Sequence, residues 1–242
     1  MKKYLFTLLL MTAFCGWSQV TIGLKSGQIV EGQEIGEKTG EIVLTMAGGA
    51  KRSLKKDDIK YIDCPQPKYI SSLIKYTNAG KFDAVLKTEK NLKDVSLFGW
   101  GHIGHLYYSR ALVGAGKVDD ARKLLRRARF SAVNTSNKLL DDTIIIAALI
   151  DVEVADKQLS KAKEYIDMIS KKSFDSSGQK YYFLAKGNYF KAKGDPNQAL
   201  ASYFKVILLE SPKDFERKLA LDKVKEIYKE FNDPRLAELN KL

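Results

Sequence analysis

The chain is poor in the residues that carry most metal, redox and nucleophilic chemistry. It has two cysteines and two histidines in 242 residues. Two cysteines, Cys15 and Cys64, cannot form the framework of several disulfides that stabilises many small secreted folds. The sequence also lacks a Ser-His-acid arrangement, a glycine-rich phosphate loop and a paired cysteine motif. We therefore expect neither catalysis nor a bound cofactor.

Both histidines lie in one short segment, as His102 and His105. On a helix, this spacing would place them on a shared face. Two ligands are too few for a structural metal site, and no cysteine or carboxylate accompanies them at ligand spacing. We interpret them as partly exposed helix residues and expect no metal.

Positive charge is abundant but dispersed. The net charge is +12, from 41 basic and 29 acidic residues, and no run of five or more basic residues occurs. A basic chain attracts acidic partners, anionic membrane surfaces or nucleic acid at low salt. Scattered lysines, however, are typical of a solvated surface rather than of a dedicated nucleic-acid face.

The first eighteen residues have the pattern of an export signal. Lys2 and Lys3 precede an apolar run from Tyr4 to Phe14, and small residues follow at 16 and 18. The run is too short to span a bilayer, which needs about 20 helical residues. We expect cleavage after residue 18 and a periplasmic or secreted protein. Lipid anchoring at Cys15 is the alternative, although Phe14 occupies a place where a lipoprotein signal needs a small residue.

Residues 19–63 predict a small antiparallel β domain. Apolar residues alternate with polar ones, and glycine-containing turns separate short segments. The expected strands are Val20–Leu24, Gln28–Ile35, Glu41–Met46, Lys51–Leu54 and Ile59–Ile62, with a polar turn at Glu37-Lys38-Thr39-Gly40. Leu24 to Gly27 followed by Ile29 to Gly32 is similar to the opening hairpin of SH3-like and Sm-like barrels. That resemblance implies binding of peptide or RNA, but no aromatic cluster or RNA-binding motif accompanies it. We favour a structural module that docks on the helices or on a neighbour.

The segment from Cys64 to Lys68 marks the boundary between two domains. It contains two prolines within three residues, which disfavour both helix and strand. From residue 69 to 242 the apolar spacing becomes helical. With cleavage after residue 18, Cys64 would be the one remaining cysteine, either buried or free to pair between chains.

A helix-turn-helix pattern recurs through this helical domain. A small residue begins the packed face of a second helix at Val85, Ala121, Ala162 and Ala199. Subtracting positions gives spacings of 36, 41 and 37 residues, a period typical of stacked helical pairs. The pattern predicts a mainly α chain with an α-solenoid of about four helical hairpins. An amphipathic helix at about Asp214 to Phe231 would cap it.

These repeats resemble the tetratricopeptide repeat family. The glycines Gly80, Gly116 and Gly194 lie at turns, and Gly187 lies where two paired helices approach. Ala121 and Ala199 begin second helices, and Pro212 ends one. The units around Val85 and Ala162 match less well, since Ala84 and Val85 are one step out of register and Asp156-Lys157-Gln158 replaces a turn glycine.

In this family the first helix of each pair lines a concave groove that binds extended peptides. The resemblance implies that partner-binding residues occupy matching positions in the first helices of three units. The expected partner-binding residues are Leu106, Arg110, Asp151, Tyr181, Asn188 and Lys191, accompanied by Val113, Ala147, Val154 and Leu184.

The sequence as a whole favours an exported scaffold or adaptor of the bacterial cell envelope that binds another protein. The signal segment, the repeats and the missing catalytic residues all point to that class. A polyanion-binding module, which would use the basic surface and the small barrel on nucleic acid or acidic polysaccharide, is the alternative.

Overall fold

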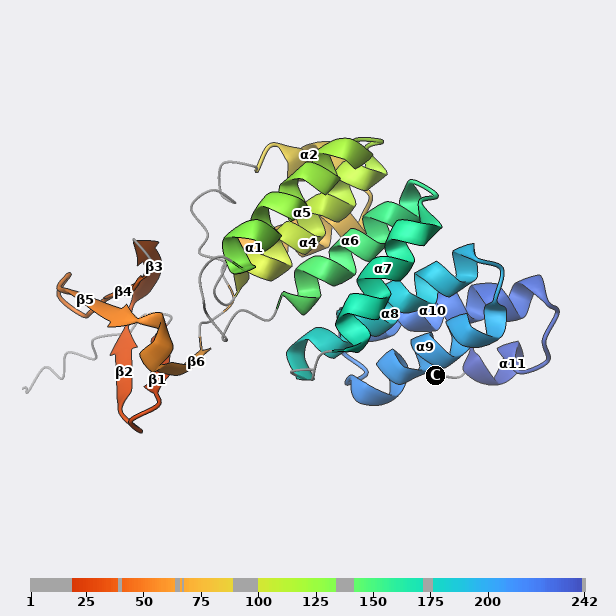
Figure 1. Cartoon of the computed structure of the whole chain (residues 1–242). Helices are drawn as coiled ribbons and strands as arrows, with labels where there is room; N and C mark the ends of the chain where they lie inside the picture. Colours follow the sequence, from red (N-terminus) through yellow and green to blue (C-terminus); the bar gives the residue numbers. More distant parts are fainter. Residues whose placement is uncertain are drawn as a thin grey trace, which may run out of the picture.

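The computed structural model is mainly helical, with two small antiparallel sheets in its N-terminal part (Figure 1). It describes residues 19–38, 41–63, 66, 68–88, 100–133, 142–171 and 176–240. The predicted signal segment with Cys15, and also Cys64, lie outside the described residues. Strand β6 ends at Asp63 and helix α1 begins at Lys68. The change from strand to helix thus falls across the predicted linker.

Each of the two sheets has three strands. One has the order β2-β1-β6 and the other the order β3-β4-β5, and all pairings are antiparallel. Their inward-facing aliphatic side chains form one small core. The elements are β1 (Val20–Leu24), β2 (Ile29–Gly32), β3 (Glu34–Lys38), β4 (Glu41–Thr45), β5 (Lys51–Lys55), the short 3₁₀ helix η1 (Lys56–Asp58) and β6 (Ile59–Asp63).

The single strand predicted from Gln28 to Ile35 is divided in the structure. It breaks at Gln33, so that β2 pairs with β1 while β3 pairs with β4. Gly32 permits this break, since a Cβ there would lie 2.5 Å from the Leu44 side chain. The turn predicted at residues 37–40 was also wrong in part, because β3 continues through Lys38. Hydrophobic alternation alone does not reveal where a strand changes sheets.

The helices follow one another as pairs joined by short turns. Pairing partners pack closely, and each first helix also contacts the next first helix. Figure 1 shows the pairs succeeding one another across the molecule in sequence order. The helices are α1 (Lys68–Asn78), α2 (Phe82–Leu86), α4 (His102–Gly114), α5 (Val118–Val133), α6 (Thr143–Ala155), α7 (Leu159–Ser170), α8 (Ser176–Ala192), α9 (Pro196–Leu209), α10 (Phe215–Glu230) and α11 (Leu236–Leu239).

The turns within the pairs share one backbone geometry. At Gly116, φ is +76° and the amide donates to the carbonyl of Val113, while Lys117 N donates to Leu112 O. This is the Schellman arrangement that ends many helices. The same two bonds and a positive φ recur at four other turns, centred on Gly80, Lys157, Gly194 and Asn232.

Two of these turns correct expectations from the sequence. The turn at Asp156-Lys157-Gln158 needs no glycine, because Lys157 itself adopts a φ of 58°. Asn232 adopts a φ of 50° after α10, and α11 follows. The last long helix is thus the first member of a further, short pair and not simply a terminal cap.

The small residues that define the pattern are buried beside these turns. Val85, Ala121, Ala162 and Ala199 each follow the turn residue by five positions and are fully buried. Val85 therefore occupies the same place as the alanines and is in register. A Cβ at Gly187 would lie 2.4 Å from the Tyr203 ring, so glycine allows α8 to approach α9.

Two further observations concern the end of α9 and the length of the apolar helices. Helix α9 ends at Leu209, and Pro212 lies in the turn that follows it. Among the described residues, no helix is both long enough and apolar enough to cross a membrane.

Candidate functional site

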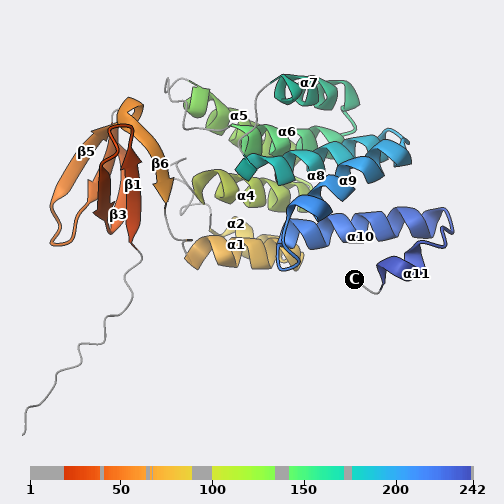
Figure 2. The ribbon, with the colours of Figure 1, turned by 90° about the horizontal axis from the view of Figure 1, so that it is seen from below.

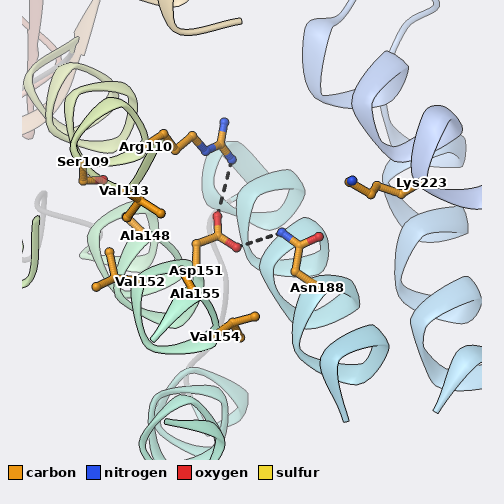
Figure 3. Close-up of a pocket in the computed structure, with 10 residues that line it drawn as sticks. All are labelled: Ser109, Arg110, Val113, Ala148, Asp151, Val152, Val154, Ala155, Asn188 and Lys223. Atoms are coloured by element: carbon orange, nitrogen blue, oxygen red, sulfur yellow. Dashed lines mark hydrogen bonds and ion pairs between the residues drawn. The ribbon is translucent and has the colours of Figure 1, made fainter. Parts of the chain in front are cut away.

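Three of the predicted partner-binding residues meet on one face of the helical array. Arg110, Asp151 and Asn188 each lie six residues before the turn residue of their pair, on α4, α6 and α8. Figure 3 shows their side chains pointing toward one another. Arg110 Nη2 lies 3.7 Å from Asp151 Oδ2, and Asn188 Nδ2 donates to Asp151 Oδ1 at 2.8 Å. Because the three residues occupy the same position in successive helix pairs, their side chains lie side by side.

These side chains form the polar part of a pocket of about 330 Å³. Small and branched apolar side chains of α4 and α6 make up most of the rest. Lys223 of α10 lies across the opening (Figure 3). The lining residues are Ser109, Arg110, Val113, Ala148, Asp151, Val152, Val154, Ala155, Asn188 and Lys223.

Burial and neighbouring charges set the ionisation of the pocket. Burial raises the pKa of Asp151 above its ordinary value, and this outweighs the opposing effects of Arg110 and Asn188. Burial favours the neutral form of Arg110 and so lowers its pKa. The nearby Asp151, Tyr107 and Glu216 outweigh this effect and raise the pKa of the guanidinium. Arg110 is therefore a fixed cation held between acidic groups from two helices.

The first turn of α10 closes one end of this face. Glu216 is almost fully buried and accepts a hydrogen bond from the Tyr107 hydroxyl. Its Oε1 lies 3.8 Å from Arg110 Nη1, and its Oε2 lies 3.9 Å from Lys180 Nζ. The ring centroid of Phe215, the first residue of α10, lies 6.4 Å from that of Tyr107 on α4, and Figure 2 shows α10 extending from there toward α11.

The other predicted residues take different positions. Leu106 and Tyr181 are buried and do not line the pocket; burial raises the pKa of Tyr181. Lys191 Nζ lies 2.9 Å from Glu226 and 3.2 Å from Glu230, so it ties α8 to α10. Of the accompanying residues, Val113 and Val154 line the pocket, whereas Ala147 and Leu184 are buried in the core.

The interpretation of the histidines as partly exposed was wrong. His102 and His105 are 6% and 9% exposed. Burial, with a smaller contribution from His105, lowers the pKa of His102 to about 4, although Asp142 opposes the shift. His105 Nδ1 lies 2.9 Å from the carbonyl of Gly101. No group of three or more metal-ligating side chains occurs in the part of the chain that the structure describes.

Several residues of this face were not predicted, among them Tyr107, Glu216 and Lys223. Glu216 and Lys223 belong to α10, which the sequence presented as a charged terminal helix. The fixed distance from each turn places Glu226, and not Glu216 or Lys223, at the α10 position that corresponds to Arg110, Asp151 and Asn188. It signals only that α10 continues the repeat. That alignment depends on recognising Asn232 as a turn residue.

Comparison with known proteins gives no family for this chain. No family model matches it, and neither a curated protein nor a solved structure matches it.

Proposed function

We propose that this chain is an exported scaffold or adaptor of the bacterial cell envelope that binds a partner protein on the α4–α6–α8 face. The observation that carries the proposal is the pocket to which Arg110, Asp151 and Asn188 contribute from one repeat position. A face built by repetition presents polar groups at regular intervals, which suits an extended chain better than a small substrate.

The proposed fold is a solenoid of the tetratricopeptide type. The recurring turn geometry, the buried small residues and the period of 36 to 41 residues support it. For the N-terminal domain we propose an SH3-like or Sm-like barrel, supported by two three-stranded sheets that share a core and are linked directly from β2 to β3.

The pocket has unused hydrogen-bonding capacity. The Asn188 amide has two N–H groups and two acceptor lone pairs. One N–H is donated to Asp151, and Oδ1 accepts from the Tyr203 hydroxyl at 2.8 Å. One donor and one acceptor position thus remain for a peptide backbone, while Val113 and Val154 offer apolar contact to a side chain.

The proposal is tested by a bulky substitution that fills the pocket and leaves its hydrogen-bonding side chains in place. Ala155 lines the pocket, whereas Ala192 occupies the same repeat position on α8 and does not. A photoreactive side chain at Val113 is expected to crosslink a discrete protein from an envelope fraction. Ala155→Trp should abolish that product, and the matched control Ala192→Trp should leave it. Loss in both variants, or in neither, would contradict binding at this pocket.

A second candidate is the polyanion-binding module. Strand β5 is an edge strand that exposes Lys51, Arg52 and Lys55. None of these cations has an ion pair with another described residue. Three unpaired charges on one short strand favour contact with phosphate or carboxylate groups.

A further inference from the structure

Polar groups in the pocket on the α4–α6–α8 face lack hydrogen bonds within the protein. Arg110 Nη2 lies 3.7 Å from Asp151 Oδ2, and Arg110 Nη1 lies 3.8 Å from Glu216 Oε1. Both separations are longer than an N–H···O hydrogen bond, which spans about 2.7–3.2 Å. Arg110 Nη1 is buried and has no hydrogen-bond partner among the described residues. Such orphaned donors are few in folded proteins, so this one needs an explanation.

Two neighbours of Arg110 complete a row of unused hydrogen-bonding positions. Asp151 Oδ1 accepts from Asn188 Nδ2 at 2.8 Å, while Asp151 Oδ2 accepts no hydrogen bond from the described residues. The second N–H of Asn188 likewise has no acceptor in the described part of the chain. Ser109, by contrast, donates its hydroxyl to the carbonyl of Leu106 at 2.8 Å. The pocket therefore offers an acceptor on Asp151 between donors on Arg110 and Asn188 (Figure 3).

The charges around the pocket disfavour an ionised ligand group. A carboxylate attracted to Arg110 would be repelled by Asp151 and Glu216, which already flank that cation. An ammonium group attracted to Asp151 would be repelled by Arg110 in the same way. A neighbouring like charge disfavours the charged form of a group. A neutral group that both donates and accepts hydrogen bonds avoids both repulsions.

Among neutral groups, a primary carboxamide matches a neighbouring donor and acceptor best. A wholly apolar side chain would cut the polar groups of the pocket off from water without giving them partners. A backbone amide cannot engage both neighbours at once, because its N–H and C=O point in opposite directions in a trans peptide. A primary carboxamide carries its C=O and its NH₂ on one carbon. Asparagine and glutamine side chains use this arrangement when they bind adenine through two hydrogen bonds.

We propose that the pocket recognises a glutamine side chain of the partner protein, whose carboxamide accepts from Arg110 and donates to Asp151. The apolar walls, to which Val113 and Val154 contribute, suit the methylene groups of that side chain. A site with a few convergent polar groups between apolar walls is typical of pockets that select one ligand group. Asn188 stays available to the adjoining peptide backbone. This inference rests on the proposed function, because it names what the same pocket binds.

NMR titration of the full chain with capped amino acids tests the proposal. N-acetyl-glutamine N-methylamide is expected to bind roughly ten times more tightly than the capped forms of glutamate and methionine, because each of those leaves a polar group repelled or unpaired. Ala155→Trp, which fills the pocket, should abolish this binding, and the matched control Ala192→Trp should bind as the unaltered chain does. Equal affinity for capped glutamine and either competitor would overturn the proposal, as would tighter binding of capped asparagine.

Asp151→Asn tests the contact with Asp151 separately. The change keeps the size of the side chain but removes the charge that repels glutamate. The preference for capped glutamine over capped glutamate should therefore shrink, and an unchanged preference would contradict the contact. Circular dichroism checks that the variant folds. If it does not fold, the comparison of Ala155→Trp with Ala192→Trp still decides whether capped glutamine binds in the pocket.

Failure of this inference and failure of the proposed function give different results. The photocrosslink from Val113 reports whether a protein binds in the pocket, and an excess of capped glutamine should reduce that crosslink. A crosslink that Ala155→Trp abolishes, without any preference for capped glutamine, would overturn the carboxamide and leave the proposed function standing. Capped glutamine that binds while no protein is crosslinked would contradict the partner protein. Tighter binding of free L-glutamine would assign the pocket to the free amino acid and overturn recognition of a side chain.

Discussion

At the scale of single residues, the turns within the helix pairs require a positive φ, which costs conformational energy where the residue is not glycine. A residue with positive φ is strained unless it is glycine, because its Cβ crowds the backbone. Gly80, Gly116 and Gly194 meet this need without cost, whereas Lys157 and Asn232 adopt φ values of 58° and 50°. A Cβ at Gly116 would meet no atom within 4 Å. Any cost there comes from the backbone alone.

Lys157→Gly is therefore expected to stabilise the chain by about 0.5–1 kcal/mol, and Gly116→Ala to destabilise it by about 1 kcal/mol. Urea unfolding followed by circular dichroism measures both. The control is Lys161→Gly, within α7, which should cost about 1 kcal/mol because glycine lowers helix propensity. Equal destabilisation by the two lysine-to-glycine changes would show that the turn carries no strain.

At the scale of elements, one buried ion pair ties neighbouring helix pairs together. Glu153 of α6 is fully buried, and Arg122 of α5 donates to it from Nε at 2.9 Å and from Nη2 at 3.1 Å. Arg122 also pairs with Asp119 and Asp156. The bidentate contact holds the start of α5 against the end of α6.

Arg122→Ala should cost about 3–5 kcal/mol, because it removes the bidentate hydrogen bonds of the buried Glu153 carboxylate and leaves only Arg126 Nη2, 3.9 Å from Oε1, near it. Asp119→Ala is the matched control: its side chain is 83% exposed, and such surface pairs contribute about 1 kcal/mol or less. Thermal and urea unfolding compare the two variants. Similar small losses in both would mean that Glu153 is satisfied by other groups.

At the scale of the whole molecule, net charge decides how the chain meets polyanions. The excess is +12, yet many cations of the helical array are paired with carboxylates, as Lys180 is with Asp214 and Lys191 with Glu226. The exposed cations Lys51, Arg52 and Lys55 on β5 have no ion pair with a described residue and are open to an extended anion. The two candidate functions therefore use different domains: the helical array would bind a partner protein, and the β domain would bind a polyanion.

If β5 binds nucleic acid through Lys51, Arg52 and Lys55, affinity for a duplex should fall roughly 40-fold between about 50 and 200 mM salt, as three released counterions require. Fluorescence anisotropy with a labelled duplex measures this. Replacing all three residues by Gln should remove most of the salt dependence. No binding even at about 50 mM salt would dispose of the polyanion function.

The sequence by itself determined the features that depend on local chain chemistry. Glycine turns, small residues at fixed spacing and helical periodicity follow from φ preference and from which side chains fit between paired helices. They predicted a mainly helical chain with a small antiparallel β domain, and this is confirmed. The positions of Arg110, Asp151 and Asn188 on matching helix faces follow from the same regularity.

Only the tertiary structure decided the features that depend on packing between distant segments. Gly32, next to the break at Gln33, lies where a Cβ would come within 2.5 Å of the Leu44 side chain on another strand, and Lys157 adopts a positive φ although it is not glycine. Glu216 meets Tyr107 across more than a hundred residues. Such contacts are set by how helices stack, and no local pattern encodes them.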